Sequence, residues 1–208
     1  MLPIRAPAMP SGQVNEGDRG IILPALQNML QLSYAPEVDK QLNAAVELSK
    51  MVQGNPIPVA SFGPLSHALC RLASGNDRTV VSYAARGIKL LVLDDALRPQ
   101  AAIAGIPVVL VEALKNWEEE VPCLREVLGA LQTLCCDKSS VGAVVDAGLV
   151  VPLTDLLDTP DLELRRLVTA TAANTLAFSD TLLLTKEACI DTFCDAMPDL
   201  LDSARRSV

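Results

Sequence analysis

The sequence has few aromatic residues, a single histidine and fewer basic than acidic side chains. Only 3% of its 208 residues are Phe, Trp or Tyr, whereas 50% are hydrophobic. Leu, Ala and Val must therefore build the core, and an aromatic-rich β-sandwich is excluded. The 17 Lys and Arg residues face 25 Asp and Glu residues, for a formal net charge of −8. General binding to nucleic acid or to an anionic membrane is not expected from this balance.

We expect neither a signal peptide nor a membrane-spanning segment from the sequence. No stretch approaches the about 20 consecutive apolar residues of a membrane span. Pro3, Pro7 and Pro10 interrupt the N-terminal region, where a signal peptide has an unbroken apolar run. The cysteines form no Cys-x-x-Cys pair and are too sparse for a disulfide framework. We therefore expect a cytoplasmic or nuclear protein with reduced, packed thiols at Cys70, Cys123, Cys135, Cys136, Cys189 and Cys194.

A repeat runs through the chain. Its most regular members are Gly20, Gly63, Gly105 and Gly148, which are 43, 42 and 43 residues apart. The segments that they open are GIILPAL, GPLSHAL, GIPVVLVEAL and GLVVPLTDLL, and AMPDLL at 196–201 is a looser fifth copy. Each period has a glycine, a nearby proline, an apolar helix of about ten residues, a polar break and a longer helix. This order predicts an array of helical repeats.

The prolines and the hydrophobic spacing predict where these helices lie. Proline is tolerated in a first helical turn and disrupts a helix interior. The apolar helices are therefore expected to open at Pro24, Pro64, Pro107, Pro152 and Pro198, and the longer ones at Pro36, Pro122 and Pro160. Two longer helices are expected at 119–136 and 159–178, the second with Thr159 as its N-cap, and a short helix at 138–148. Three helices in each period are typical of armadillo repeats.

The segments AIAGIPVVLVEAL and CLREVLGALQTLCCDKSSVGAVVDAGLVVPLTDLLD resemble armadillo repeats, and the resemblance extends over roughly 20–202. It implies an all-α fold, a right-handed armadillo superhelical solenoid of about four repeats plus a partial fifth. The fifth repeat either caps the array or belongs to a longer one. The expected organisation is a disordered N-terminal tail at 1–19 and an armadillo domain at 20–208, with repeats near 20–62, 63–104, 105–147, 148–190 and 191–208.

A finer resemblance concerns VVSYAARGIKLLV at 80–92, followed by AGIPVVLVEAL, and ATAANTLAFSD at 170–180, followed by DTFCDAMPDLLD. This order resembles the N-terminal armadillo region of HECT-type ubiquitin ligases of the ubiquitin-fusion-degradation class. In that family the region lies far from the catalytic domain and helps to hold substrate or ubiquitin. The resemblance implies recognition without chemistry, because the chain is too short to hold a HECT domain as well. The importin-α ladder of Trp and Asn is not matched, since the only tryptophan, Trp117, lies between helices.

No combination of side chains in the sequence predicts catalysis or a metal site. His67 is the only histidine, and a packed or solvent-facing role on an apolar helix is favoured over catalysis. Cys135 and Cys136 are adjacent and project from different sides of a helix, and Cys189 and Cys194 also diverge, so packing is favoured over zinc binding. The glycines recur singly rather than in a phosphate-binding loop. Neither an enzyme activity nor a cofactor is expected.

The longest helices of an armadillo array line its concave surface, where binding residues are expected. Polar or basic side chains on that side, within a chain of net charge −8, predict a groove for an extended or acidic protein segment. Arginine contacts to carboxylates or carbonyls would hold it. The alternative is an ordinary solvated helix face. The candidates are Lys40, Asn43, Arg78, Arg86, Lys89, Arg125, Arg165, Thr169 and Asn174.

The function expected from the sequence is therefore a non-catalytic protein-binding scaffold. Its finer form is the substrate- or ubiquitin-recognition part of a HECT-type ubiquitin ligase, with ubiquitin or a ubiquitinated substrate as partner. The alternative is a structural armadillo adaptor in a cytoskeletal or ciliary assembly. Such an adaptor would bind through apolar patches on the convex side, and its association would persist at high salt. Neither nucleic acid nor a membrane is an expected partner.

Overall fold

The fold is that of a computed structural model, which describes residues 16–53, 57–117, 119–157 and 159–178. Within these ranges the chain forms α-helices and no strand, and no helix there combines the length and hydrophobicity needed to cross a lipid bilayer. Residues 1–15 of the expected tail at 1–19 lie outside the described residues. Residues 16–19 belong to the first helix, which begins at Glu16. The expected fifth repeat at 191–208 lies outside them entirely.

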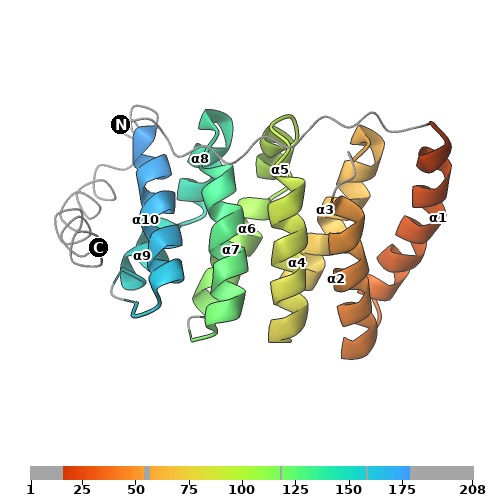
Figure 1. Ribbon diagram of the computed structural model, residues 1–208, viewed down its shortest axis with the longest axis horizontal. Helices are drawn as coiled ribbons and strands as arrows, with labels where there is room; N and C mark the ends of the chain where they lie inside the picture. The colour runs from red at the N-terminus through yellow and green to blue at the C-terminus, as the bar shows by residue number, and fades with distance from the viewer. Residues whose placement is uncertain (1–15, 54–56, 118, 158, 179–208) are drawn as a thin grey trace.

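The helices follow one another in an extended array (Figure 1). They are α1 (Glu16–Ser33), α2 (Val38–Val52), α3 (Val59–Ala73), α4 (Arg78–Leu91), α5 (Arg98–Ile103), α6 (Ile106–Asn116), α7 (Val121–Leu134), α8 (Lys138–Asp146), α9 (Val150–Asp155) and α10 (Leu162–Ala177). Helices α2, α4, α7 and α10 lie side by side in one row, each packed on the next, while α3 and α6 lie behind them. We call this row the ladder, and its outward side the ladder face.

Two glycines of the repeat separate helices, and a third does not. Gly105 and Gly148 have positive φ angles of 79° and 90°, and they separate α5 from α6 and α8 from α9. Gly63 has no such angle and lies inside α3, followed by Pro64. The prediction that Pro64 opens a helix was therefore wrong, because the chain keeps helical dihedral angles through Gly63. Pro24, within α1, is likewise interior rather than initial.

The helix starts differ in detail from those expected. Pro107 and Pro122 lie in the first turns of α6 and α7, as predicted. The N-cap of α10 is Asp161 rather than Thr159, because the Asp161 carboxylate accepts a hydrogen bond of 2.8 Å from the backbone N–H of Leu164. The short helix expected at 138–148 is confirmed as α8.

Small residues let the ladder helices approach one another closely. Ala44 on α2, Ala84 on α4 and Ala130 on α7 are fully buried. A Cβ added at Gly87 would lie 2.8 Å from a methyl group of Leu69 and 3.5 Å from the backbone of α2. A larger residue at Gly87 would have to displace the end of the Leu69 side chain. The small residues at these positions thus favour the close spacing of the ladder.

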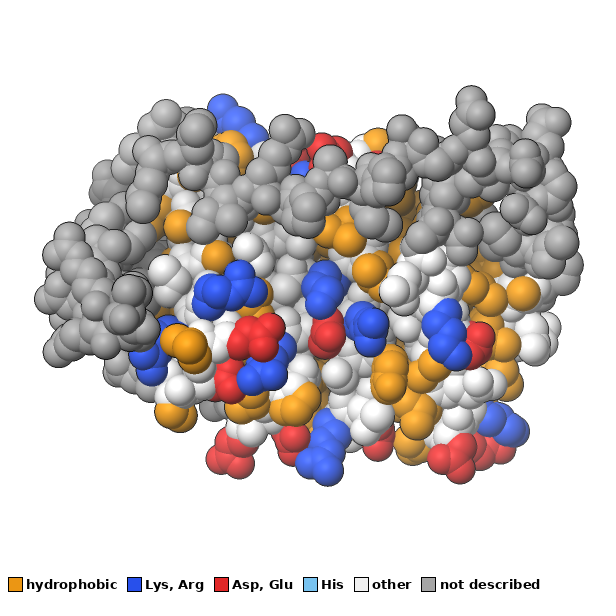
Figure 2. Space-filling model, viewed as in Figure 1, with side chains coloured by type: hydrophobic (Ala, Val, Ile, Leu, Met, Phe, Trp, Pro, Cys, Tyr) orange, Lys and Arg blue, Asp and Glu red, His pale blue; other side chains and the backbone are white. Residues whose placement is uncertain are grey.

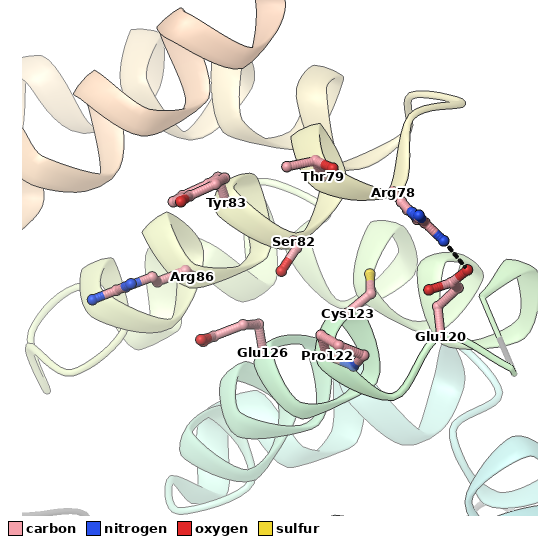
Figure 3. A pocket seen from close by; sticks show the side chains of 9 residues that line it. All are labelled: Arg78, Thr79, Ser82, Tyr83, Arg86, Glu120, Pro122, Cys123 and Glu126. Carbon is pink, nitrogen blue, oxygen red and sulfur yellow. Dashed lines mark hydrogen bonds and ion pairs between the residues drawn. The ribbon is translucent and has the colours of Figure 1, made fainter.

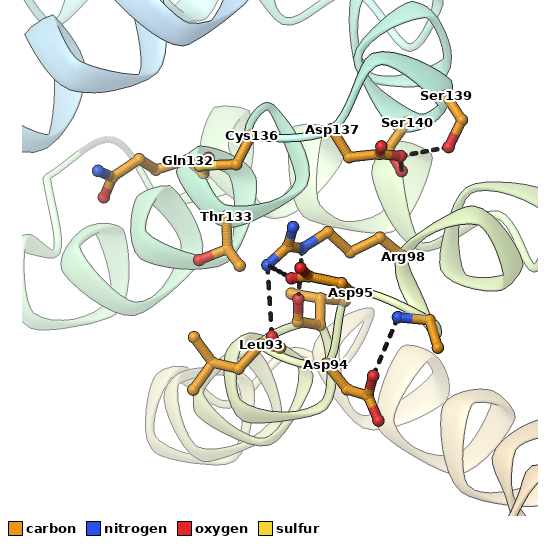
Figure 4. Close-up of polar contacts among 12 residues, drawn as sticks. Leu93, Asp94, Asp95, Arg98, Gln132, Thr133, Cys136, Asp137, Ser139 and Ser140 are labelled. Carbon is orange, nitrogen blue, oxygen red and sulfur yellow. Dashed lines mark hydrogen bonds and ion pairs between the residues drawn. The ribbon is translucent and has the colours of Figure 1, made fainter. Parts of the chain in front are cut away.

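A buried arginine fixes the connection from α4 to α5 (Figure 4). Arg98 is only 5% exposed. Its Nε donates to the carbonyl of Val92 at 2.9 Å and its Nη2 to that of Leu93 at 3.3 Å. The same Nη2 lies 2.6 Å from the carboxylate of Asp95. Arg98 thus satisfies carbonyls at the end of α4 that no further helical turn can reach, and it sets the angle at which the chain leaves the ladder.

Candidate functional site

The ladder helices bury one side and expose the other. On α7, solvent reaches the side chains of Pro122, Arg125, Glu126 and Gln132. Arg125 and Glu126 follow Pro122 by three and four residues, and Gln132 follows Arg125 by seven, about two helical turns. This spacing is one face of a helix. Figure 2 shows that face from the front, with basic and acidic side chains close together across the middle of the row. The exposed side of the ladder is therefore a polar surface of mixed charge.

An open pocket of about 490 Å³ lies on this face between α4 and α7 (Figure 3). The α4 wall presents side chains at steps of three and four residues, so they lie along one line of that helix. The α7 wall begins at the residue before the helix and extends one and a half turns. The lining residues are Arg78, Thr79, Ser82, Tyr83, Arg86, Glu120, Pro122, Cys123 and Glu126.

Ion pairs join successive ladder helices at the edges of this pocket. Arg78 on α4 lies 2.7 Å from Glu120, the N-cap residue of α7. Lys89 on α4 pairs with Glu126 on α7. The aliphatic part of Lys89 crosses α7 at Gly129, where an added Cβ would lie 2.8 Å from it. Two of the three cations that α4 contributes to the face are thus held by carboxylates of α7.

A third ion pair joins α7 to α10. Arg125 lies 2.6 Å from the carboxylate of Asp161 and 3.4 Å from that of Glu163. The hydrogen bond from Arg125 is the largest cause that lowers the pKa of Asp161 below its ordinary value, and the backbone N–H of Leu164 adds to the effect. Asp161 therefore caps α10 and joins it to α7 at the same time.

The structure places most of the predicted site residues on the ladder face. Most of them form ion pairs or hydrogen bonds with other residues of the chain. Lys40 pairs with Glu37 of its own turn at 2.8 Å. Arg165 donates twice to the carbonyl of Thr159, and Thr169 donates to the carbonyl of Arg165. The ion pairs above hold Arg78, Lys89 and Arg125, while Asn43 is exposed on α2.

Asn174 does not line the surface. Its side chain is buried, and its Nδ2 lies 3.3 Å from the carbonyl of Gln132, which connects α10 to α7. The expected separation of basic from acidic residues is also incomplete, because Glu120, Glu126 and Asp161 lie among the cations. Glu120 and Asp161 are the N-cap residues of α7 and α10, whereas Glu126 lies on α7 itself; none of the three was among the predicted site residues.

Among the predicted basic residues, Arg86 differs from the others because it has no partner among the described residues. Its side chain is exposed at the rim of the pocket, and no ion pair or hydrogen bond joins it to any residue that the structure describes. The side-chain hydroxyls of Thr79, Ser82 and Tyr83 likewise have no hydrogen-bond partner in the described ranges. These groups leave one wall of the pocket with donors that are available to a ligand.

The other candidates from the sequence have structural partners. Nδ1 of His67 is 2.8 Å from the hydroxyl of Tyr34, and the guanidinium of Arg71 lies 4.6 Å from the centre of that ring. Cys135 is fully buried, and burial raises the pKa of its thiol to about 12. In the described part of the chain, no three His, Cys, Asp or Glu side chains gather closely enough to hold a metal ion.

Comparison with known proteins finds similarity in structure but not in sequence. No protein-family model and no curated protein matches the chain. Among solved structures, computationally designed armadillo repeat proteins for modular peptide recognition superpose with a TM-score of 0.62, at 19% identity, over 81% of this chain and 79% of that one. The chain has an armadillo-type fold. The fold class predicted from the repeat period is confirmed.

Two engineered proteins from the Northeast Structural Genomics Consortium are also similar to this armadillo-type chain. One superposes with a TM-score of 0.67 at 23% identity, over 83% of this chain and 68% of that one. The other has a TM-score of 0.66 at 22% identity, over 82% of this chain and 40% of that one. In arrays of this kind the stacked repeats form an extended concave surface that is suited to binding.

Proposed function

We propose that this chain is a non-catalytic scaffold that binds an extended segment of a partner protein along the ladder face. The observation that carries the proposal is the row of four packed helices with an open pocket of about 490 Å³ between α4 and α7. The structural neighbour designed for modular peptide recognition supports the same class of function.

The spacing of the ladder sets the length of the segment. Packed helices lie about 8–10 Å apart, and an extended chain advances about 3.3 Å per residue. Each ladder helix then faces about three residues of the segment, and the four helices face about ten to twelve. Amide side chains that reach solvent, such as the exposed Asn43 on α2 and the half-buried Gln132 on α7, are suited to bind its backbone groups.

A selection from a phage-displayed library of random dodecapeptides tests this function. Ser82→Trp fills the pocket, and Val108→Trp places the same bulk on α6, where Val108 is 54% exposed behind the ladder. We expect selected peptides to lose most of their affinity for the first variant and to keep it for the second. Circular dichroism of both variants verifies the fold. The proposal fails if no peptide is enriched, or if the two variants bind equally.

The finer proposal is that the partner is ubiquitin or a ubiquitinated substrate of a HECT-type ligase. It is supported by the resemblance of 80–92 and 170–180 to the armadillo region of those ligases. Titration of ¹⁵N-labelled ubiquitin with the purified chain tests it directly. Saturable shifts of ubiquitin amide signals, weakened by Ser82→Trp, would support the proposal, and unchanged spectra at millimolar chain would exclude ubiquitin itself.

Exposed hydrophobic side chains behind the ladder favour a second candidate, a structural adaptor of a cytoskeletal or ciliary assembly. Ile103, Val108 and Val151 are 88%, 54% and 66% exposed on α5, α6 and α9. Association through these residues would persist at high salt. Co-sedimentation with purified microtubules at low and high salt, with Val108→Asp and Val151→Asp as variants, distinguishes this candidate from binding at the ladder face.

A further inference from the structure

We propose that the pocket between α4 and α7 is the anchor of the bound segment, and that it takes an anionic side chain, a carboxylate or a phosphate, on Arg86. The inference rests on the proposed function and names the chemistry that the partner must carry. The partner is therefore an extended acidic or phosphorylated peptide.

The charges around the pocket leave Arg86 as its one uncompensated group among the described residues. Glu120 is held by Arg78 at 2.7 Å, and Glu126 is held by Lys89. Arg86 faces the same opening with no ion pair of its own in the described ranges. The pocket therefore carries a local positive charge on a chain whose formal net charge is −8.

The hydrogen-bonding groups on the α4 wall agree with an anionic ligand. Thr79, Ser82 and Tyr83 also line the pocket from α4, and their hydroxyls make no hydrogen bond within the described chain. Figure 3 shows Ser82 pointing toward α7 and Tyr83 projecting from the edge of α4 that faces away from α7. Ser82 follows Thr79 by three residues and precedes Arg86 by four, so these three side chains share one side of α4, while Tyr83, adjacent to Ser82, lies at its edge. A guanidinium binds a carboxylate or phosphate with two parallel hydrogen bonds, and neighbouring hydroxyls donate to the remaining lone pairs.

A cationic side chain is disfavoured at the same place. A lysine or arginine of a partner would have to displace Arg78 or Lys89 from its carboxylate, and it would also approach the unpaired Arg86. An anion meets no such competition, because both carboxylates of the pocket already have cations. The pocket therefore selects against basic peptides even though the whole chain is acidic.

The test is a dodecapeptide selection on the full chain, repeated with Arg86→Gln. We expect the wild type to enrich peptides with Asp or Glu at one fixed position, and Arg86→Gln to lose that enrichment. Synthetic versions of the best peptide, with Glu, Gln or phosphoserine at that position, are then measured by fluorescence anisotropy. Gln should weaken binding to the wild type about tenfold, the size of one charge-assisted pair. The comparison of Glu with phosphoserine shows which of the two anions the pocket binds more tightly.

Two further variants separate a local effect from a general electrostatic one. Lys138→Gln removes one exposed charge from α8, outside the ladder, and should leave peptide affinity unchanged. Glu126→Gln releases Lys89 into the pocket and should tighten binding of the Glu peptide about fivefold.

The possible outcomes are distinct. Enrichment of peptides without an acidic position, or an acidic position that persists with Arg86→Gln, overturns this inference and leaves the scaffold function standing. An equal effect of Lys138→Gln and Arg86→Gln also overturns it. A selection that enriches no peptide overturns both proposals.

Discussion

Gly63 and Gly105 occupy equivalent places in the repeat, yet they should differ in how much stability alanine costs at each. Gly63 lies inside α3 without a positive φ, and a Cβ added there would meet nothing within 4 Å. Alanine is favoured over glycine in a helix interior by about 1 kcal/mol. The gain is offset by Pro64, because a proline ring disfavours helical backbone angles at a preceding residue that carries a Cβ. Gly63→Ala should therefore leave the free energy of unfolding within about 0.5 kcal/mol of the wild-type value.

The same substitution at Gly105 should introduce backbone strain. Its φ is 79°, and the space around it is also open, so the only effect of a Cβ is on the backbone. An L-residue in the left-handed region costs about 1–2 kcal/mol. Gly105→Ala should therefore lower the free energy of unfolding by about this amount. Gly105→Asn should lose less, because asparagine tolerates this conformation better than alanine does.

Urea titrations followed by circular dichroism at 222 nm measure both effects. The midpoint should stay close to that of the wild type for Gly63→Ala and fall for Gly105→Ala, while the m-value stays that of the wild type. If Gly63→Ala destabilises the chain as much as Gly105→Ala does, then the chain turns at Gly63 and α3 is two helices. That result would refute the argument from local backbone geometry.

Three further predictions concern polar and thiol groups. Arg98→Met should lower the free energy of unfolding by about 2–3 kcal/mol, because it leaves buried carbonyls without a donor. Urea titration measures this loss. A loss within about 0.5 kcal/mol, as for a surface residue, would contradict the prediction. Arg125 lowers the pKa of Asp161 below its ordinary 3.8, so that carboxylate stabilises the fold above the unfolded pKa and ceases to do so as the pH falls through the lowered one. Asp161→Asn keeps the cap acceptor but not the charge, and the Tm difference from wild type should vanish on acidification; a difference that stays constant would argue against the ion pair. Burial raises the pKa of Cys135 to about 12, so iodoacetamide at about pH 8 should label this thiol only after unfolding. Peptide mass spectrometry detects the label. Prompt labelling of Cys135 in the folded chain would be inconsistent with its burial.

The fold was predictable because its signal is repeated. The glycines, the prolines and the apolar spacing recur in each period, so a local error at one place is outweighed by agreement at the others. What the period does not contain is the backbone angle at each glycine. Gly63 and Gly105 look alike in sequence, and only the φ angle shows that one continues a helix and the other ends it.

The candidate site was predictable in place but not in detail. The spacing of Arg86 and Arg125 on long helices was enough to place both on the exposed side of the array. Their partners depend on which side chains of the next helix come within reach, and this is set by packing across the ladder. The sequence therefore could not show that Arg125 is held by Asp161, 36 residues away, while Arg86 is left without a partner among the described residues.

Site-specific photocrosslinking tests the central claim, that an extended segment binds the ladder face, most directly. p-Benzoylphenylalanine is placed at Thr79, on the rim of the pocket, or at Val108, behind the ladder. Each variant is irradiated with the tightest dodecapeptide from the selection. We expect a crosslinked product from position 79 and none from position 108. A product from position 108 alone would place the binding surface on the other side of the array and contradict the account.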